Sequence, residues 1–400
     1  MIAEIRPFSL KGSVCAPPSK SMAHRYLIGA ALCGKECTIS GVDYSEDILA
    51  SIDCLRALGA RVDICNDSVT VDPRGFMKGK PSELFCRESG STLRFLIPLA
   101  LCTGERVDFS GSERLFERPL DVYEELCREN GFLFEKRKNS LSVCGKLDRD
   151  IYTVRGDVSS QFITGLIFAL VYLKKDSKIN ILPPFESRSY VALTVSALKS
   201  FGAEVGFDGD CCIKIKGREL RPYFGRVEGD YSNAAFLDAF NFIGSDVSVE
   251  NLDPSSLQGD RVYHTYFEEI NAGSPTLDIS DCPDLGPVLF ALSALKNGAR
   301  FIGTDRLRAK ESDRGMAMHE ELSRLGGGLL IGDKEITVPK QELKPIKEAL
   351  WGHNDHRIVM ALSLILSRLG GAIDGAEAVR KSYPGYFDDI RRLGAKVEVK

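Results

Sequence analysis

Basic, hydroxyl and glycine residues stand where apolar helices are predicted to begin. Lys20 and Ser21 open the first of these helices, Ser21 is a suitable capping residue, and Arg25 lies one turn further on the same face. Gly90, between two serines, lets the backbone approach a ligand closely. Because a helix N-terminus offers free N–H groups and the positive end of its dipole, these starts favour bound anions.

Two further segments add groups of the same kind. Ser159, Ser160 and Gln161 open another apolar helix, and two hydroxyls with an amide can bind a phosphate and a hydroxylated ring together. Arg118 adds a cation. The first half of the chain is therefore predicted to bind small oxygen-rich anions.

Carboxylates accompany the cations of the second half. Lys310 and Arg314, four residues apart, are expected to share a helical face with Glu311 beside them. Asp284 precedes an apolar helix. Since like charges repel, a cationic cluster with few acids needs anionic ligands such as phosphates and carboxylates. The cations expected to converge on one cleft are Lys20, Arg25, Arg118, Lys310, Arg314, Arg357 and Lys381.

The elements that position these residues repeat along the chain. An amphipathic helix ends at a glycine expected to adopt positive φ, and a strand follows. An apolar helix can be recognised in each period as well. Six such units predict internal duplication and an α/β fold of two similar domains with three helix–strand units each. The recurring glycines are Gly59, Gly131, Gly202, Gly273, Gly326 and Gly394.

The boundary between the domains is predicted away from the midpoint. Pro17 and Pro18 disfavour helix and indicate an extended crossover, and a second crossover is predicted near 223–230. We therefore expect one domain at 18–228 and a discontinuous one formed by 1–17 with 229–400.

Composition excludes several classes of protein. The formal net charge is −4, which disfavours non-specific binding of nucleic acid. Mean hydropathy is −0.09, and neither a membrane span nor a secretion signal is recognised. The twelve cysteines show no zinc-ligand spacing, and no Walker or dinucleotide fingerprint occurs. We expect a cytoplasmic, monomeric protein without metal or cofactor.

Together these segments resemble the 5-enolpyruvylshikimate-3-phosphate (EPSP) synthase family of enolpyruvyl transferases. The likeness runs in the family's order from Pro18-Ser19-Lys20-Ser21 to Lys381-Ser382-Tyr383-Pro384, and its most specific pieces are 307–314 and Asn354-Asp355-His356-Arg357. Glu88 and Arg306 depart from the family's usual residues. The resemblance implies an inside-out α/β barrel in each domain and a two-stranded hinge between them.

The resemblance also implies roles for individual residues. Asp284 would act as the base, and Glu311, assisted by Lys20, as the proton donor. The middle domain would bind most of shikimate 3-phosphate, whose ligands would be Lys20, Ser21, Arg25, Ser159, Ser160, Gln161, Ser187, Asp284 and Lys310. Phosphoenolpyruvate would be bound by Lys20, Gly90, Arg118, Gln161, Arg314, Arg357 and Lys381.

The implied reaction is transfer of the enolpyruvyl group of phosphoenolpyruvate to the 5-hydroxyl of shikimate 3-phosphate. It proceeds by addition and elimination, releases phosphate, and belongs to the shikimate pathway of chorismate and aromatic amino-acid biosynthesis. No cofactor is implied. Domain closure is expected when shikimate 3-phosphate neutralises the middle domain.

Two alternatives remain open from the sequence. A UDP-N-acetylglucosamine enolpyruvyl transferase typically has Lys-Asn where this chain has Lys20-Ser21, and a cysteine in the loop at 111–117, which has none here. A non-catalytic anion-binding relative would need the cations but not Asp284 and Glu311.

Overall fold

The computed structural model describes residues 1–79 and 83–400 and divides into two compact units. We call Pro18–Glu228 the middle unit, and Met1–Pro17 with Gly229–Lys400 the C-terminal unit. Each unit has its own hydrophobic core. The α/β class predicted from the sequence is confirmed.

The described part of the middle unit contains three four-stranded sheets that share one pattern. In each sheet a parallel edge strand pairs with a strand that is followed by an antiparallel hairpin. The repeated pattern agrees with duplication of one helix–strand unit. In spatial order the sheets are β14 (Phe224–Arg226), β3 (Cys37–Ser40), β5 (Ser68–Asp72), β4 (Arg61–Cys65); β6 (Leu84–Phe85), β7 (Val107–Ser110), β9 (Ser140–Cys144), β8 (Leu133–Lys136); and β10 (Ile151–Arg155), β11 (Ser177–Leu182), β13 (Cys212–Ile215), β12 (Val205–Phe207).

Three apolar helices of the middle unit, α1, α3 and α6, are buried along almost their whole length, and α6 packs against both α1 and α3. The other helices bury one face, as in α5, where Val122 and Leu126 point inward. The three apolar helices therefore form the centre of the unit's hydrophobic core. The helices are α1 (Lys20–Leu32), α2 (Glu46–Ala57), α3 (Gly90–Ala100), α4 (Glu113–Glu117), α5 (Asp121–Asn130), α6 (Ser160–Leu173) and α7 (Arg188–Ser200).

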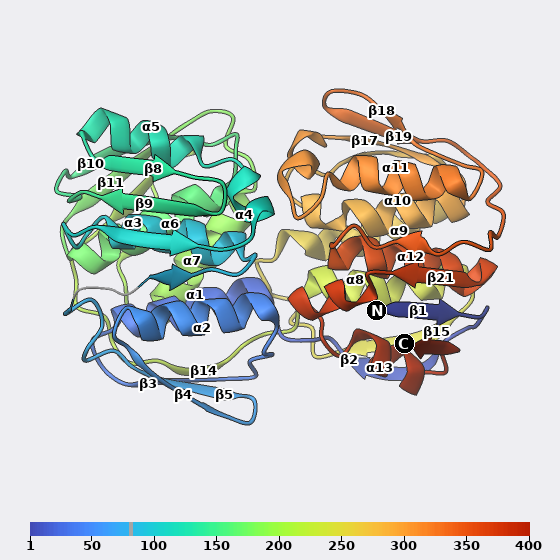
Figure 1. The fold of residues 1–400 in the computed structure, drawn as a ribbon, viewed down its shortest axis with the longest axis horizontal. Helices are drawn as coiled ribbons and strands as arrows, with labels where there is room; N and C mark the ends of the chain where they lie inside the picture. The colour runs from blue at the N-terminus through green and yellow to red at the C-terminus, as the bar shows by residue number, and fades with distance from the viewer. Residues whose placement is uncertain (80–82) are drawn as a thin grey trace. The chain divides into compact units, whose positions relative to one another are not determined.

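The C-terminal unit repeats this pattern with help from the start of the chain. Strand β1 lies beside β21 and pairs with both β21 and β22 (Figure 1), while β2 pairs in parallel with β15. The N-terminal segment therefore supplies the third member of one sheet and the edge of another. The sheets are β20 (Leu350–Trp351), β21 (Gly371–Asp374), β1 (Ile2–Ile5), β22 (Val397–Val399); β16 (Thr276–Asp278), β17 (Ala299–Ile302), β19 (Glu335–Val338), β18 (Leu330–Ile331); and β15 (Asp246–Glu250), β2 (Lys11–Cys15).

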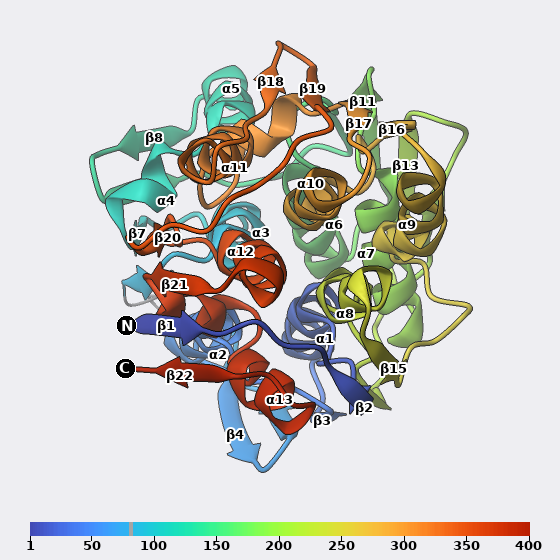
Figure 2. The same cartoon turned by 90° about the vertical axis from the view of Figure 1, so that its right-hand side faces the viewer.

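Helices α8, α10 and α12 lie side by side within the C-terminal unit (Figure 2). Two short 3₁₀ segments carry predicted site residues, Asp284 in Pro283–Leu285 and Lys381 in Ala376–Lys381, and Lys310 directly follows a third one at Asp305–Ala309. The α-helices are α8 (Tyr231–Asp238), α9 (Tyr263–Ala272), α10 (Gly286–Leu295), α11 (Arg314–Arg324), α12 (His356–Leu369) and α13 (Tyr386–Arg392).

The recurring glycines mostly adopt the conformation expected of them. Five of them, Gly59, Gly131, Gly202, Gly326 and Gly394, have φ between 68° and 108°. Gly273 is the exception, because it leaves α9 in an extended conformation with φ of −175°. The expectation of positive φ is therefore wrong at that one position.

No helix in the described ranges is long and apolar enough to cross a membrane. Across residues 1–79 and 83–400, no group of three or more His, Cys, Asp or Glu side chains is arranged to hold a metal ion. All twelve cysteines are free thiols.

Candidate functional site

The start of α1 positions the first predicted cation. Pro17 and Pro18 keep the chain extended, so the helix begins at Lys20 and Ser19 caps it by accepting from the Met22 amide. The prediction that Ser21 caps this helix is therefore wrong by two residues. Lys20 Nζ lies 2.8 Å from Oδ2 of Asp47 in the first turn of α2.

Arg25 is 3% exposed and is held by uncharged oxygens. It donates to the Ser21 carbonyl at 2.6 Å, to Thr194 Oγ1 at 2.9 Å and to the Tyr190 carbonyl at 2.9 Å. Burial lowers the pKa of Arg25 to about 10, so it stays charged at neutral pH. These contacts join α1 to the first turns of α7. Ser187, just before α7, is buried and has a left-handed backbone with φ of 49°.

The N-terminus of α3 lies against Arg118. Ser89 caps this helix by accepting from the Thr92 amide at 3.2 Å. A Cβ atom on Gly90 would lie only 2.6 Å from Arg118 Nη1. The absence of a side chain at Gly90 therefore leaves the space that the guanidinium occupies.

Gln161, in the first turn of α6, connects this group to α3. Its Nε2 donates to Ser91 Oγ at 2.9 Å, and its Oε1 accepts from Arg94 Nη1 at 2.9 Å. Ser159 caps α6 and accepts from the Gln161 amide at 3.3 Å, while Ser160 is buried beside it. The described contacts thus gather the predicted residues of the middle unit at the starts of α1, α3, α6 and α7.

Asp284 is the centre of the predicted group in the C-terminal unit. Its carboxylate lies 2.7 Å from Arg314 Nη1, 3.0 Å from Lys310 Nζ and 3.2 Å from Arg357 Nη2. Residues far apart in sequence therefore share one acceptor.

Two more acids surround Arg314, whose side chain is 1% exposed. Glu311 Oε2 lies 2.8 Å from its Nη2, and Asp355 Oδ2 lies 2.9 Å from its Nε. The expectation of few acids among the cations is therefore wrong here, since a buried cation needs paired charges. The expected helical face is wrong too: Lys310 is extended, and α11 begins only at Arg314, capped by Asp313.

These ion pairs shift the protonation of the acids. Burial raises the pKa of Asp284, but Arg357, Lys310 and Arg314 outweigh it and hold that pKa well below its usual range. Burial likewise raises the pKa of Asp355, but Arg314 outweighs this effect, so the pKa of Asp355 lies below its ordinary value. Burial also lowers the pKa of Lys310, although Asp284 opposes the shift. At neutral pH both aspartates are therefore carboxylates.

Lys381 joins the group through the turn before α12. Its Nζ donates to the Asn354 carbonyl at 2.7 Å. His353 and Asn354 have φ of 49° and 50°, so the turn is left-handed at two successive residues. Glu321 of α11 holds this turn by accepting from the Trp351 amide at 3.0 Å and contacting His353 Nε2 at 3.1 Å. The Trp351 and His353 rings contact each other with centroids 4.2 Å apart and planes tilted by 34°.

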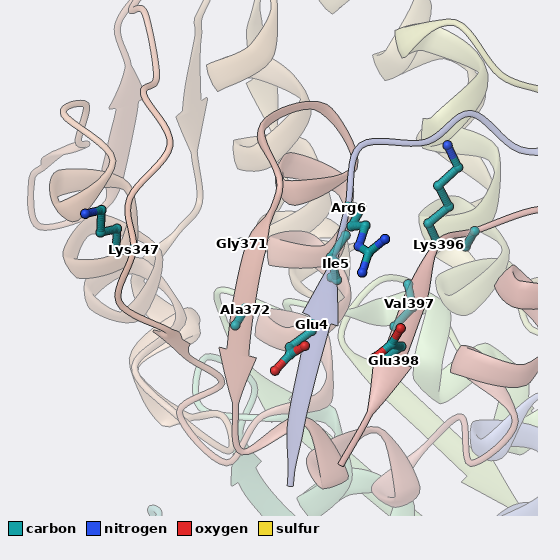
Figure 3. A pocket seen from close by; sticks show the side chains of 10 residues that line it. Glu4, Ile5, Arg6, Lys347, Gly371, Ala372, Lys396, Val397 and Glu398 are labelled. Carbon is teal, nitrogen blue, oxygen red and sulfur yellow. The ribbon is translucent and has the colours of Figure 1, made fainter.

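A separate groove of about 640 Å³ lies on the sheet that contains β1, and none of the predicted site residues line it. Figure 3 shows Glu4 and Glu398 on neighbouring strands, with Arg6 and Lys396 further along. Its charges are mixed, and Glu4 already accepts from Lys400 at 2.9 Å. The groove is therefore distinct from the cation-rich group around Asp284.

Several contributors were not predicted as site residues. Asp47, Arg94 and Thr194 bind predicted residues directly, and Asp355 was recognised only as part of the motif before Arg357. Only Asp47 has a local sequence signal, because acidic residues are favoured in the first turn of a helix, at the positive end of its dipole.

The architecture is that of the enolpyruvyl transferases. An EPSP synthase structure from Acinetobacter baumannii matches with a TM-score of 0.78 and 22% sequence identity, covering 100% of this chain and 99% of the other. At that identity the likeness establishes the fold.

The EPSP synthase (3-phosphoshikimate 1-carboxyvinyltransferase) family model matches residues 6–390, and the chain belongs to this family. A 3-phosphoshikimate 1-carboxyvinyltransferase from Clostridium kluyveri is 39% identical, covering 98% of this chain and 97% of the relative. One from Clostridioides difficile is 37% identical, covering 99% and 98%. Both the predicted family and the enzyme class are confirmed.

Proposed function

We propose that this enzyme transfers the enolpyruvyl group of phosphoenolpyruvate to the 5-hydroxyl of shikimate 3-phosphate, with Asp284 at the reacting centre. The observation that carries this proposal is the Asp284 carboxylate, which three cations hold ionised within one buried cluster. Family membership supports the same activity in aromatic amino-acid biosynthesis.

Residues of the middle unit are proposed to bind the substrates by their anionic and hydroxyl groups. The proposed shikimate 3-phosphate ligands of this unit are Lys20, Ser21, Arg25, Ser159, Ser160, Gln161 and Ser187. The proposed phosphoenolpyruvate ligands are Lys20, Gly90, Arg118 and Gln161. The assignment is supported by the positions of these residues at helix starts and by two guanidinium groups beside them, Arg118 at Gly90 and Arg94 at Gln161.

Residues of the C-terminal unit are proposed to carry the proton transfers. Asp284 accepts the proton of the 5-hydroxyl as its oxygen attacks C2 of phosphoenolpyruvate, and Glu311, assisted by Lys20, donates a proton to C3. The tetrahedral adduct then expels inorganic phosphate as the bond between C2 and the bridging phosphate oxygen breaks, and Glu311 takes a proton back from C3, so that the enol ether forms. Lys310 also contacts shikimate 3-phosphate, and Arg314, Arg357 and Lys381 stabilise the phosphate and carboxylate charges.

The paired acids have a consequence for binding. Arg314 and Arg357 are balanced by Asp284, Glu311 and Asp355. A phosphate bound here would therefore share these guanidinium groups with carboxylates, whose charges offset the cost of burying the cations.

We also propose that the protein acts as a cytoplasmic monomer. One chain supplies every residue of the proposed mechanism, and its twelve thiols are all free, as is usual in a reducing compartment.

The experiment that tests the proposed function compares Asp284→Asn with the unaltered enzyme. We expect the enzyme to release phosphate from the two substrates together, and Asp284→Asn to lower kcat by roughly 10²–10⁴-fold. Calorimetry should show retained binding of shikimate 3-phosphate, because the isosteric amide preserves shape. Asp333→Asn, an exposed aspartate of the same unit, is the matched control. Phosphate release only with UDP-N-acetylglucosamine, or full activity of Asp284→Asn, would contradict the proposal.

A further inference from the structure

Two successive residues of α1 begin two separate buried hydrogen-bond chains. His24 points toward α2 and α3, whereas Arg25 points toward α7 and α6. Both side chains are at most 3% exposed, so neither chain is in contact with bulk water. The first chain ends at the cap of α3, and the second ends in the second turn of α6.

The first chain consists of four side chains. His24 Nδ1 lies 2.8 Å from Ser51 Oγ, Ser51 Oγ lies 2.8 Å from Thr92 Oγ1, and Thr92 Oγ1 donates to Ser89 Oγ at 2.8 Å. All four are at most 1% exposed. Ser89 is the cap of α3, so the chain runs from α1 through α2 to the residues just before Gly90.

The order of donors in this chain follows from its chemistry. Each hydroxyl has one proton, and Thr92 uses its proton toward Ser89. Ser51 then donates to Thr92, and we assign the remaining donor role to Nδ1–H of His24. Burial, with Lys20 and Arg25 nearby, holds the pKa of His24 well below its usual value, which keeps the imidazole neutral. The proton is assigned to Nδ1 from the order of donors in the chain, and not from the pKa.

The second chain holds Arg25. Arg25 Nε donates to Thr194 Oγ1 at 2.9 Å, and Thr194 Oγ1 lies 2.8 Å from Thr164 Oγ1. Both threonines are 0% exposed. This chain connects α1, α7 and α6 and does not include a residue of α3.

We propose that His24, Ser51 and Thr92 are positioning residues for the phosphoenolpyruvate end of the site. They fix the capped start of α3 relative to α1 and so set where Gly90 lies against Arg118. Thr194 and Thr164 do the same for Arg25 and hence for shikimate 3-phosphate. This inference rests on the proposed assignment of Gly90 and Arg118 to one substrate and Arg25 to the other.

The test exchanges one buried hydroxyl for a methyl group in each chain. Thr92→Val is expected to raise the KM for phosphoenolpyruvate about tenfold, the effect of one hydrogen bond of ordinary strength, and to change the Kd for shikimate 3-phosphate alone less than twofold. Thr194→Val should instead raise the Kd for shikimate 3-phosphate about tenfold and change the KM for phosphoenolpyruvate less than twofold. A purely structural role would lower the melting temperature without changing either constant, or would weaken the binding of both substrates equally, and either result would overturn the proposal.

Two His24 variants provide a rescue that does not depend on Thr92→Val folding well. The amide nitrogen of Asn occupies the place of Nδ1, so His24→Asn should keep the KM for phosphoenolpyruvate within about threefold, while His24→Leu should raise it about tenfold. Equal losses in both variants would overturn the role of the chain.

Arg118→Lys separates this proposal from the one on which it rests. An unchanged KM for phosphoenolpyruvate in Arg118→Lys would overturn the site assignment itself. A raised KM in Arg118→Lys, together with an unchanged one in Thr92→Val, would overturn only the positioning role.

Discussion

A single methyl group added at Gly90 would directly displace Arg118, which is a proposed phosphoenolpyruvate-binding residue. Alanine there would place Cβ 2.6 Å from Arg118 Nη1, and the flexible arginine is the partner that has to move. We therefore expect Gly90→Ala to raise the KM for phosphoenolpyruvate by about tenfold or more while the KM for shikimate 3-phosphate changes little. Steady-state kinetics with each substrate varied in turn measure both values.

Gly206→Ala is the matched control for that substitution. Gly206 lies in β12 with open space around the position of a Cβ atom, and its φ is not positive. Its kinetics should equal those of the unaltered enzyme. Equal KM values for phosphoenolpyruvate in both variants would show that Arg118 does not depend on the space at Gly90.

The sequence identifies cations better than it identifies their partners. Lys20 and Arg25 were predicted from their places at a helix start, a local property. The oxygen that binds Arg25 comes from Thr194, and the carboxylate that binds Lys20 comes from Asp47. Such partners depend on how distant helices pack, and no spacing within a single segment encodes this.

The turn between β20 and α12 depends on a neighbouring helix. Glu321 of α11 accepts from the Trp351 amide and from Arg324, and contacts His353. Its side chain is 4% exposed. We expect Glu321→Ala to reduce the free energy of unfolding by roughly 1.5–3 kcal/mol, because buried donors lose a charged acceptor. Urea unfolding measures the change.

Glu320→Ala tests whether burial is the reason. The Glu320 side chain is 53% exposed and reaches His353 only at 3.8 Å. We expect a change within about 0.5 kcal/mol, as for most surface substitutions. A loss as large as that of Glu321→Ala would indicate that charge near α11, and not the buried hydrogen bonds, stabilises the turn.

Helix starts and glycine ends were largely predictable, but the segment 305–314 was not. Its charged residues suggested one helix, and Lys310 and Arg314 were placed on one face. A 3₁₀ turn and an extended Lys310 precede α11 instead, and the Asp313 cap fixes where the helix begins. The two cations still meet, through Asp284, which local periodicity cannot reveal.

Across the whole molecule, the two units carry different pH-sensitive groups. In the middle unit the pKa of His24 is lowered by burial and by Lys20 and Arg25; in the C-terminal unit the pKa values of Asp284 and Asp355 are held low by Arg357, Lys310 and Arg314 against the effect of burial. A lowered folded-state pKa gives stability that is present above the unfolded-state pKa and is lost as the pH falls. The window begins near pH 6.5 for His24 and near pH 4 for the aspartates.

We therefore expect stability to fall between about pH 6.5 and 5 by up to about 1.4 kcal/mol per pH unit from His24 alone. His24→Asn cannot take up this proton, so its urea midpoint should change less between pH 7.5 and 5.5. Hydrogen exchange of middle-unit peptides in urea locates the effect. Identical slopes in the two proteins would mean that His24 is not held neutral.

The duplicated fold could be predicted because each repeat carries the same helix–glycine–strand signal. The prolines at 17 and 18 lead us to expect that 1–17 joins 229–400, but the sequence does not show that Ile2–Ile5 pairs with β21 and β22, which lie more than 360 residues further along the chain. Periodicity identifies elements, whereas strand order depends on contacts that the chain makes only when folded.

The contact between the rings of Trp351 and His353 has a practical consequence. Trp351 is the single tryptophan of the chain, so the intrinsic fluorescence of the protein at red-edge excitation comes from this one position. The turn that follows Trp351 carries the carbonyl that accepts from Lys381. The enzyme thus contains a built-in optical reporter a few residues from the ion-pair cluster, without any added dye.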